Sequence, residues 1–178
     1  NISKILGADI LKRPDALATD IATTFDTIFH AVDNIKSYDY VVLLQPTSPL
    51  RDEVHIDKAI ELLEFKNADA IVSVCEMEHS PMWSNTLPKN ENMSKFIKDE
   101  VKNKRSQDLD TYFRLNGAIY ICKTEKLLKE KSFFIKESIF AYKMDRKSSI
   151  DIDEELDFLF AKFLLTNKVN RNKGNLSE

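Results

Sequence analysis

The chain has 178 residues, a length that suits one domain and is enough to bury a continuous core. With 43% hydrophobic and 31% charged residues, its composition is typical of a globular protein and excludes an intrinsically disordered one. The formal net charge of -3 provides no general electrostatic attraction to nucleic acid, so we also exclude nucleic-acid binding.

Several other classes of protein are excluded by what the sequence lacks. No apolar run approaches the roughly 20 residues of a membrane-spanning helix, and no secretory signal pattern opens the chain, so we expect a cytoplasmic protein without a membrane partner. The three glycines, at 7, 117 and 174, cannot form a Walker loop or a dinucleotide-binding fingerprint. Cys75 and Cys122 lie in apolar runs without the spacing of a zinc site, and we expect buried free thiols.

Helical and strand-like patterns alternate along most of the chain. Apolar residues recur every three or four positions in the helical stretches, whereas the strand-like stretches are short runs of β-branched and aromatic residues. In chain order we predict a helix over residues 21–32 with Thr19 or Asp20 as its N-cap, a strand over 40–44, a helix over 54–65, strands over 70–75 and 115–122, a helix over 124–131, a strand over 139–144 and a helix from about residue 153. A strand, a helix and a second strand form a βαβ unit, so we predict an α/β fold with a mostly parallel sheet flanked by helices.

The periodic pattern is interrupted between residues 76 and 112, where Pro81 and Pro88 break it and polar residues dominate the second half. A segment of this length without periodicity inside a domain is usually a functional loop or an excursion from the core. The end of the chain is polar and carries little apolar surface. We therefore predict a single domain over residues 1–167, with an excursion over about 76–112, and a mobile polar tail over 168–178.

The strand predicted over residues 40–44 stops abruptly in a polar turn. Its apolar run is typical of a strand buried on both faces, and Pro46 and Pro49 prevent the ladder from continuing. The carboxyl end of this strand, the edge at which open α/β sheets bind ligands, therefore carries Gln45, Thr47, Ser48 and Arg51. The pattern alone is equally compatible with an ordinary turn.

Two aspartates near the last helix form a possible metal site. In the extended segment Ser-Ile-Asp-Ile-Asp-Glu-Glu, residues 149–155, Asp151 and Asp153 point the same way, and their carboxylates repel each other unless a cation separates them. Magnesium takes one or two carboxylates and completes its shell with water and phosphate oxygens. The alternative is that Asp153 caps the last helix while Glu154 and Glu155 favour its dipole, which leaves a metal role for Asp151 open.

Both segments resemble motifs of one protein family. Residues 43–51, Leu-Leu-Gln-Pro-Thr-Ser-Pro-Leu-Arg, and residues 149–155 are similar to two signatures of the CMP-N-acylneuraminate synthetases, or acylneuraminate cytidylyltransferases, which activate sialic acids. Leu-Ala-Thr-Asp over 17–20 and Leu-Asn-Gly-Ala-Ile-Tyr-Ile over 115–121 are also family-like, and the resemblance spans about residues 8–165. It implies a Rossmann-like nucleotidyltransferase fold and a homodimer formed through the excursion.

The resemblance further implies a reaction. The anomeric hydroxyl of the sugar acid attacks the α-phosphorus of CTP, which yields CMP-N-acylneuraminate and pyrophosphate in sialic acid biosynthesis. Asp151 and Asp153 would be the catalytic residues that hold Mg²⁺, the cofactor we expect, against the phosphates. The expected partners are CTP, a nine-carbon sugar acid and a second copy of the chain.

Five residues match substrate-contacting positions of that family. The resemblance implies that Gln45, Thr24 and Tyr120 contact the sugar acid, and that Phe133 and Phe134 are the aromatic pair that enters the partner subunit's sugar pocket. From the residues alone, Gln45 and Thr24 are compatible with ordinary turn and cap roles, and Tyr120 with packing in a core strand. Phe133 and Phe134 cannot both face one side of a strand, so one should be core and the other a surface or interface residue.

Two arginines are further candidate ligands on chemical grounds. Arg105 and Arg114 can each bind a carboxylate or a phosphate through the guanidinium fork. Arg105 ends a basic run over residues 102–105, however, and such runs are usually solvated faces. For both arginines, ligand binding and an ordinary surface role therefore stay as alternatives.

The sequence departs from the family pattern in two places. The basic, glycine-containing loop of the form Ile-Pro-Ala-Arg-x-Gly-Ser-Lys, which wraps the CTP phosphates, does not occur, so we expect an N-terminally incomplete domain that is inactive by itself. Trp83 stands where some sialate-specific members carry a lysine, which leaves the sugar acid open. The alternatives are a cytidylyltransferase for legionaminic, pseudaminic or a Kdo-like acid, and a non-catalytic dimeric sugar-binding domain.

Overall fold

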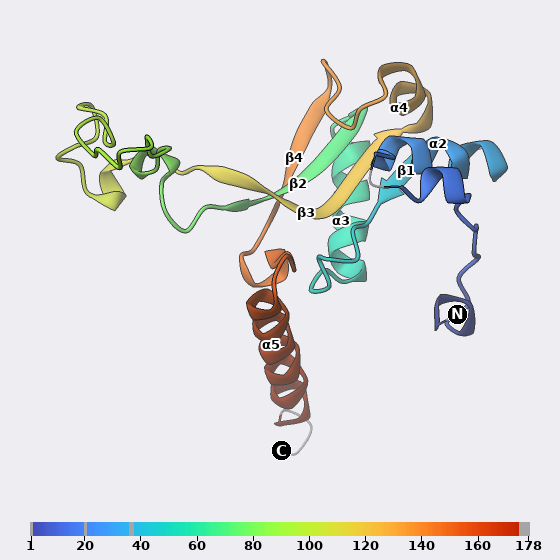
Figure 1. Cartoon of the computed structure of the whole chain (residues 1–178). Helices are drawn as coiled ribbons and strands as arrows, with labels where there is room; N and C mark the ends of the chain where they lie inside the picture. The colour runs from blue at the N-terminus through green and yellow to red at the C-terminus, as the bar shows by residue number, and fades with distance from the viewer. Residues whose placement is uncertain (1, 20, 36–37, 175–178) are drawn as a thin grey trace.

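The computed structural model describes residues 2–19, 21–35 and 38–174 (Figure 1). Its α-helices are α1 (Ile2–Ile5), α2 (Thr24–Asn34), α3 (Glu53–Phe65), α4 (Thr124–Glu130) and α5 (Glu155–Gly174), and its strands are β1 (Tyr40–Leu43), β2 (Ala70–Glu76), β3 (Phe113–Lys123) and β4 (Ile139–Met144). Each predicted strand and helix is present within a few residues of its expected bounds, and the single turn of α1 was not predicted.

The four strands form one mixed sheet in the order β1-β3-β2-β4. Strand β3 runs antiparallel to both β1 and β2, whereas β2 and β4 are parallel. The predicted α/β class is confirmed. The prediction of a mostly parallel sheet is wrong, because two of the three described strand pairings are antiparallel. The long excursion between β2 and β3 returns the chain in the opposite direction, and the composition of an apolar strand does not encode its direction.

Helices cover both faces of this sheet. Because side chains alternate along a strand, Ile71, Ile119 and Ile121 pack against α3, where Ala59 and Leu63 are fully buried. The intervening residues of the same strands face α2 and α4 in a second cluster, which includes Ile28, Ala70, Cys122, Leu127, Phe133 and Ile135. The predicted central strand β1 contributes to both clusters, although it lies at the edge of the described sheet and is only half-buried.

Helix α2 begins later than its sequence pattern predicts. Thr23 is its N-cap and accepts the Asp26 N–H at 3.2 Å, while the Asp26 carboxylate accepts the Thr23 N–H at 2.8 Å. This reciprocal capping box makes Thr24 the first residue of the helix, so Thr19 is not its N-cap. Asp20, the other predicted cap, lies outside the described residues.

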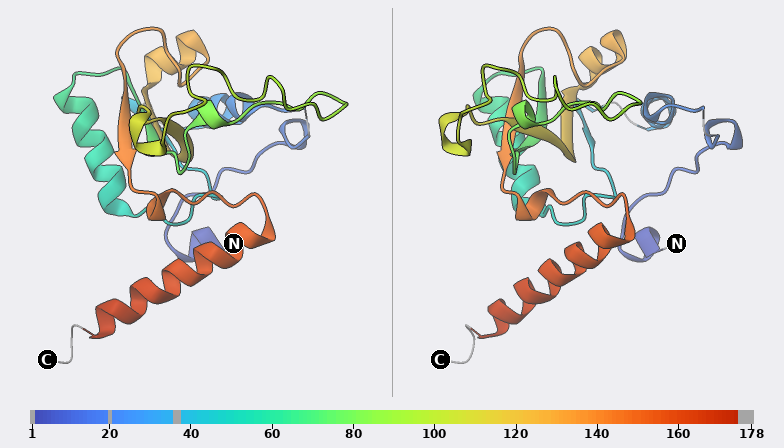
Figure 2. Two further views of the ribbon diagram at one scale, coloured as in Figure 1. Left: turned by 90° about the vertical axis from the view of Figure 1, so that its left-hand side faces the viewer. Right: turned by 60° about the vertical axis from the view of Figure 1, so that its left-hand side comes forward.

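Two segments extend away from the sheet. The excursion between β2 and β3 lies to one side of it, and α5 projects from the end of β4 (Figures 1 and 2). Four apolar residues that follow helical spacing in α5 are therefore exposed, from 49% at Phe160 to 72% at Leu156; the other two are Leu159 and Phe163. Helix α5 continues to Gly174, so the backbone of residues 168–174 is helical, and the rest of the predicted tail lies outside the described residues. No helix in the described ranges has the length and hydropathy needed to cross a membrane.

Candidate active site

A β-bulge in β3 forms the floor of the site. The register between β2 and β3 shifts between Val72 and Val74, so one stretch of β3 loses its regular pairing. Ser73, fully buried beneath it, donates its hydroxyl proton to Asn116 Oδ1 at 2.6 Å and accepts the Ile119 N–H at 2.8 Å. These bonds replace the missing ladder bonds and hold the bulge in one shape.

Gly117 lies at this bulge, and three oxygen-bearing side chains converge over it. Its φ of +70° is in the region that favours glycine, and a Cβ atom there would lie 2.6 Å from Gln45 Oε1, 3.1 Å from Asp151 Oδ2 and 3.2 Å from Ser48 Oγ. The absence of a side chain at 117 thus leaves room for Gln45, Ser48 and Asp151 around one position. The two predicted site segments are adjacent in space.

The turn that carries Gln45 is held from within. Arg51 Nη1 donates to the carbonyl oxygens of Gln45 and Ser48 at 2.6 and 2.7 Å. Ser48 is fully buried, and its hydroxyl lies 3.3 Å from the Asn116 carbonyl oxygen, which joins the turn to the bulge. Burial lowers the pKa of Arg51, but an arginine stays charged at neutral pH, so it is available to both carbonyls. Arg51 therefore supports the turn and is not aimed at a ligand.

The segment that carries the two aspartates is joined to the same turn. The Ile152 N–H donates to the Thr47 carbonyl at 2.8 Å, and Ser48 Oγ lies 3.4 Å from Asp151 Oδ1. Asp151 is half-buried, whereas Asp153 is exposed. The N–H groups of Asp153 and Glu154 donate to Asp157 Oδ2 at 3.1 and 3.0 Å, so the carboxylate that serves the start of α5 is that of Asp157.

The donor atoms at this position suit a hard cation. The three side-chain atoms nearest to the space above Gly117 are oxygens, from Gln45, Ser48 and Asp151, and oxygen is the ligand atom that Mg²⁺ prefers. Within the part of the chain that the structure describes, no cluster of three or more His, Cys, Asp or Glu side chains is arranged to hold a metal. A magnesium ion held by Asp151 and Asp153 would thus take its remaining ligands from water and substrate phosphate, which fits the chemistry of Mg²⁺.

Aromatic residues form a wall beside Asp151. Tyr120 pairs with Leu43 across β1 and β3, and its ring centroid lies 5.6 Å from Phe133 and 6.4 Å from Phe134. Burial raises the pKa of Tyr120, and the charge of Asp151 raises it further, so the phenol keeps its proton. Phe133 is 3% exposed and Phe134 54% exposed, which confirms that one is core and the other surface.

The remaining predicted ligands are placed differently. Thr24 is exposed in the first turn of α2, next to Phe25, whose ring lies 5.8 Å from Phe133. Arg114 donates to the Ser149 carbonyl at 3.3 Å, beside the aspartate segment. Arg105 is 73% exposed in the excursion and forms a bidentate pair with Asp108, at 3.1 and 3.3 Å.

The structure thus unites Gln45, Tyr120 and Asp151, and it adds residues that the sequence patterns did not single out. These are Ser73 and Asn116, buried polar residues whose partners are remote in sequence. Ser48, which the sequence placed at the strand end, is buried with them. One signal was available, because a glycine inside a strand pattern often marks a bulge or a close approach of two segments.

The chain is similar to known cytidylyltransferases in sequence, although no family model matches it. It is 38% identical over 176 residues to the N-acylneuraminate cytidylyltransferase of Escherichia coli O18:K1:H7, in an alignment that covers 98% of this chain and 41% of that protein. It is 31% identical over 163 residues to the CMP-N,N'-diacetyllegionaminic acid synthase of Legionella pneumophila, covering 86% of this chain and 67% of the relative. The chain thus spans less than half the length of the Escherichia coli relative.

Two solved structures share its fold. A CMP:2-keto-3-deoxy-manno-octonic acid synthetase complexed with CTP superposes with a TM-score of 0.58 at 10% identity, over 92% of this chain and 75% of that one. The 4-diphosphocytidyl-2C-methyl-D-erythritol synthase of Anaerococcus prevotii gives a TM-score of 0.55 at 12% identity, over 81% and 67%. At these identities the similarity shows the fold alone, an α/β fold that this chain shares with both synthetases.

Proposed function

Because the chain belongs to the N-acylneuraminate cytidylyltransferase family, we propose that its site activates a sialic-acid-type sugar by joining it to CMP from CTP. The observation that carries the proposal is the convergence of Gln45, Ser48 and Asp151 above Gly117. A sugar-positioning amide and a metal-binding carboxylate are needed at one place, and this bulge is where the two segments meet.

In the proposed reaction, the anomeric hydroxyl oxygen bonds to the α-phosphorus of CTP. The bond from that phosphorus to the oxygen bridging the β-phosphate breaks, and pyrophosphate leaves. Such transfers depend chiefly on positioning and on neutralising phosphate charge. Mg²⁺, when bound, supplies that neutralisation, and Asp151 and Asp153 are the residues that would hold it.

The sugar acid would bind between the Gln45 turn and the aromatic wall. The Gln45 amide and the protonated phenol of Tyr120 both offer hydrogen-bond donors to a carboxylate or hydroxyl. Phe133 is buried behind Tyr120 and supports its ring, while Phe134 retains exposed apolar surface for the sugar or for a second subunit. Thr24 and Arg114 would lie at the margins of this pocket.

We also place a dimer interface on the excursion of residues 77–112, as the family resemblance implies. In a homodimer, the exposed Phe134 of one subunit would close the sugar pocket of the other, and Arg105 would act from the excursion. Analytical ultracentrifugation of the chain should give a mass of two copies, and a monomer at all concentrations would contradict this part of the proposal.

Direct ligand binding tests the site. In isothermal titration calorimetry with CMP-N-acetylneuraminate and Mg²⁺, Gln45→Ala should weaken binding by about tenfold, the loss of one or two hydrogen bonds. Gln107→Ala is a matched control, since Gln107 is an exposed glutamine in the excursion. Unchanged affinity of the Gln45→Ala variant would refute the placement of the sugar site at Gln45.

A chimera tests catalysis. A family N-terminal segment with the Ala-Arg-x-Gly-Ser-Lys loop, fused ahead of the chain, should give pyrophosphate release from CTP and N-acetylneuraminate. Binding of the sugar nucleotide without pyrophosphate release would instead favour a non-catalytic sugar-binding domain.

A second candidate substrate is legionaminic acid. The similarity to the Legionella pneumophila synthase, which covers two thirds of that protein, favours this alternative specifically. Side-by-side kcat/KM values of the chimera for the two acids would decide between them.

A further inference from the structure

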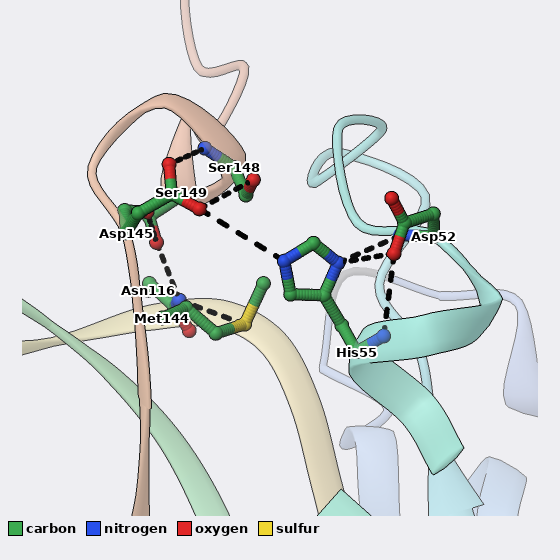
Figure 3. Close-up of polar contacts among 7 residues, drawn as sticks. All are labelled: Asp52, His55, Asn116, Met144, Asp145, Ser148 and Ser149. Carbon is green, nitrogen blue, oxygen red and sulfur yellow. Dashed lines mark hydrogen bonds and ion pairs between the residues drawn. The ribbon is translucent and has the colours of Figure 1, made fainter. Parts of the chain in front are cut away.

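His55 lies between two carboxylates on different elements (Figure 3). It is in the first turn of α3, where its Nδ1 is 2.5 Å from Asp52 Oδ1 and its backbone N–H donates to the same oxygen at 3.2 Å. Nδ1 also accepts the Asp52 backbone N–H at 3.2 Å, so His55 and Asp52 form a reciprocal capping box at the start of α3. On the other side, Nε2 is 3.9 Å from Asp145 Oδ2, an ion-pair distance when the imidazole is protonated. The ring is only 18% exposed.

Asp145 begins the loop that leads to the aspartate pair. Its carboxylate accepts the Ser148 N–H at 3.0 Å and the Ser148 hydroxyl at 2.9 Å, and its backbone carbonyl accepts the Ser149 hydroxyl at 2.7 Å. Asn116 donates its amide to the same Ser149 oxygen at 2.8 Å, which joins the loop to the bulge. Asp145 therefore organises the loop, and the loop ends at Asp151.

The turn and the first turn of α3 contact this loop at both of its ends. Near the aspartates, the Thr47 carbonyl accepts the Ile152 N–H. At the other end, eight positions further along the same stretch of chain, His55 lies between Asp52 and Asp145. These contacts join both ends of the loop to one continuous stretch of chain, from the Thr47 turn to the first turn of α3.

We propose that His55 is a positioning residue that holds the loop over residues 145–152 against the turn and so aligns Asp151 for metal binding. This role rests on the proposed function of Asp151. In this proposal His55 acts on Asp151 through Asp145 and the loop. Part of its effect is screened by solvent, because the Asp145 side chain is 60% exposed, so each variant should have a modest effect.

Paired variants separate this role from general destabilisation. The amide of His55→Asn can replace Nδ1 beside Asp52 but cannot reach Asp145, whereas the longer amide of His55→Gln can reach toward it. Two variants, His55→Asn and Asp145→Asn, should each raise the exchange rate of the Ile152 amide about threefold to fivefold and weaken Mn²⁺–pyrophosphate binding by a similar factor. The double variant should be no worse than either single one, and His55→Gln should be close to wild type.

The controls lie elsewhere in the chain. The Lys123 amide, which donates to the Asp69 carbonyl at the far end of β3, should keep its exchange rate, and His79→Asn, a change at an exposed histidine, should have no effect. An unchanged Ile152 rate in His55→Asn, or an equal rise at Lys123, would overturn the positioning role. Amide exchange is measured without metal, so it tests the role of His55 independently of the metal site. Normal Mn²⁺–pyrophosphate binding by Asp151→Asn would refute the proposed metal site and leave the exchange test of His55 unaffected.

Discussion

Replacing Gly117 by alanine is the sharpest single perturbation of this site. The new Cβ would lie 2.6 Å from Gln45 Oε1, closer than a carbon and an oxygen can approach, so the Gln45 side chain must move. The atoms of Asp151 and Ser48, at 3.1 and 3.2 Å, would need to retreat by only a few tenths of an ångström. We therefore expect Gly117→Ala to disturb the amide more than the carboxylate.

The cost in stability has two parts. An alanine at a φ of +70° costs about 1–2 kcal/mol, and crowding in a packed site typically costs about 1–3 kcal/mol. The lower half of that second range applies, since the end of the Gln45 side chain can rotate away. A total of about 2–4 kcal/mol would lower the melting temperature of a protein of this size by about 4–16 °C.

Gly7→Ala is the matched control, because Gly7 has a φ of +86° and no atom within 4 Å of its would-be Cβ. It has backbone strain without crowding. Differential scanning calorimetry and titration with CMP-N-acetylneuraminate should show that Gly117→Ala loses both stability and about tenfold in affinity, whereas Gly7→Ala keeps its affinity. Adding Gln45→Ala to Gly117→Ala should restore part of the stability but none of the affinity. Wild-type affinity in Gly117→Ala would refute the reasoning that Gln45 is held above this glycine for the ligand.

Two further predictions concern the metal carboxylate and a buried thiol. Asp151→Asn should weaken Mn²⁺–pyrophosphate binding about tenfold, measured by electron paramagnetic resonance with an unchanged circular dichroism spectrum, while Asp99→Asn, at an exposed aspartate of the excursion, should have no effect. Equal binding by both variants would contradict the metal assignment. Burial raises the pKa of Cys122 from 9.0 to about 11, with the charges of Asp69 and Glu130 adding to the effect. The unfolded chain therefore loses this proton at lower pH, so the stability linked to the neutral thiol is complete below pH 9 and is lost as pH rises toward 11. Between pH 9 and 11, the urea midpoint of unfolding should fall less steeply with pH in Cys122→Ala than in the wild-type chain. Equal slopes in the two proteins would show that the Cys122 thiol does not cause the loss of stability.

The sequence alone determined the elements of this fold and the identity of its family. Apolar periodicity located the strands and the longer helices because each must bury one stripe or both faces against its neighbours. The neighbouring pair Phe133 and Phe134 was correctly divided between core and surface, since adjacent side chains cannot face the same way. Local motifs also indicated that Gln45 and Asp151 belong to one site, through resemblance and not through any calculation of contact.

Only the tertiary structure decided how those residues meet. The direction of β3 depends on the path of a long excursion, and the bulge at Gly117 depends on hydrogen bonds from Ser73 and Asn116 that span tens of residues. Ser48 and Asp151 are 103 positions apart, and no local propensity can indicate that they face each other. The resemblance in sequence therefore identified the candidate residues, whereas long-range polar contacts place Gln45 and Asp151 next to Gly117.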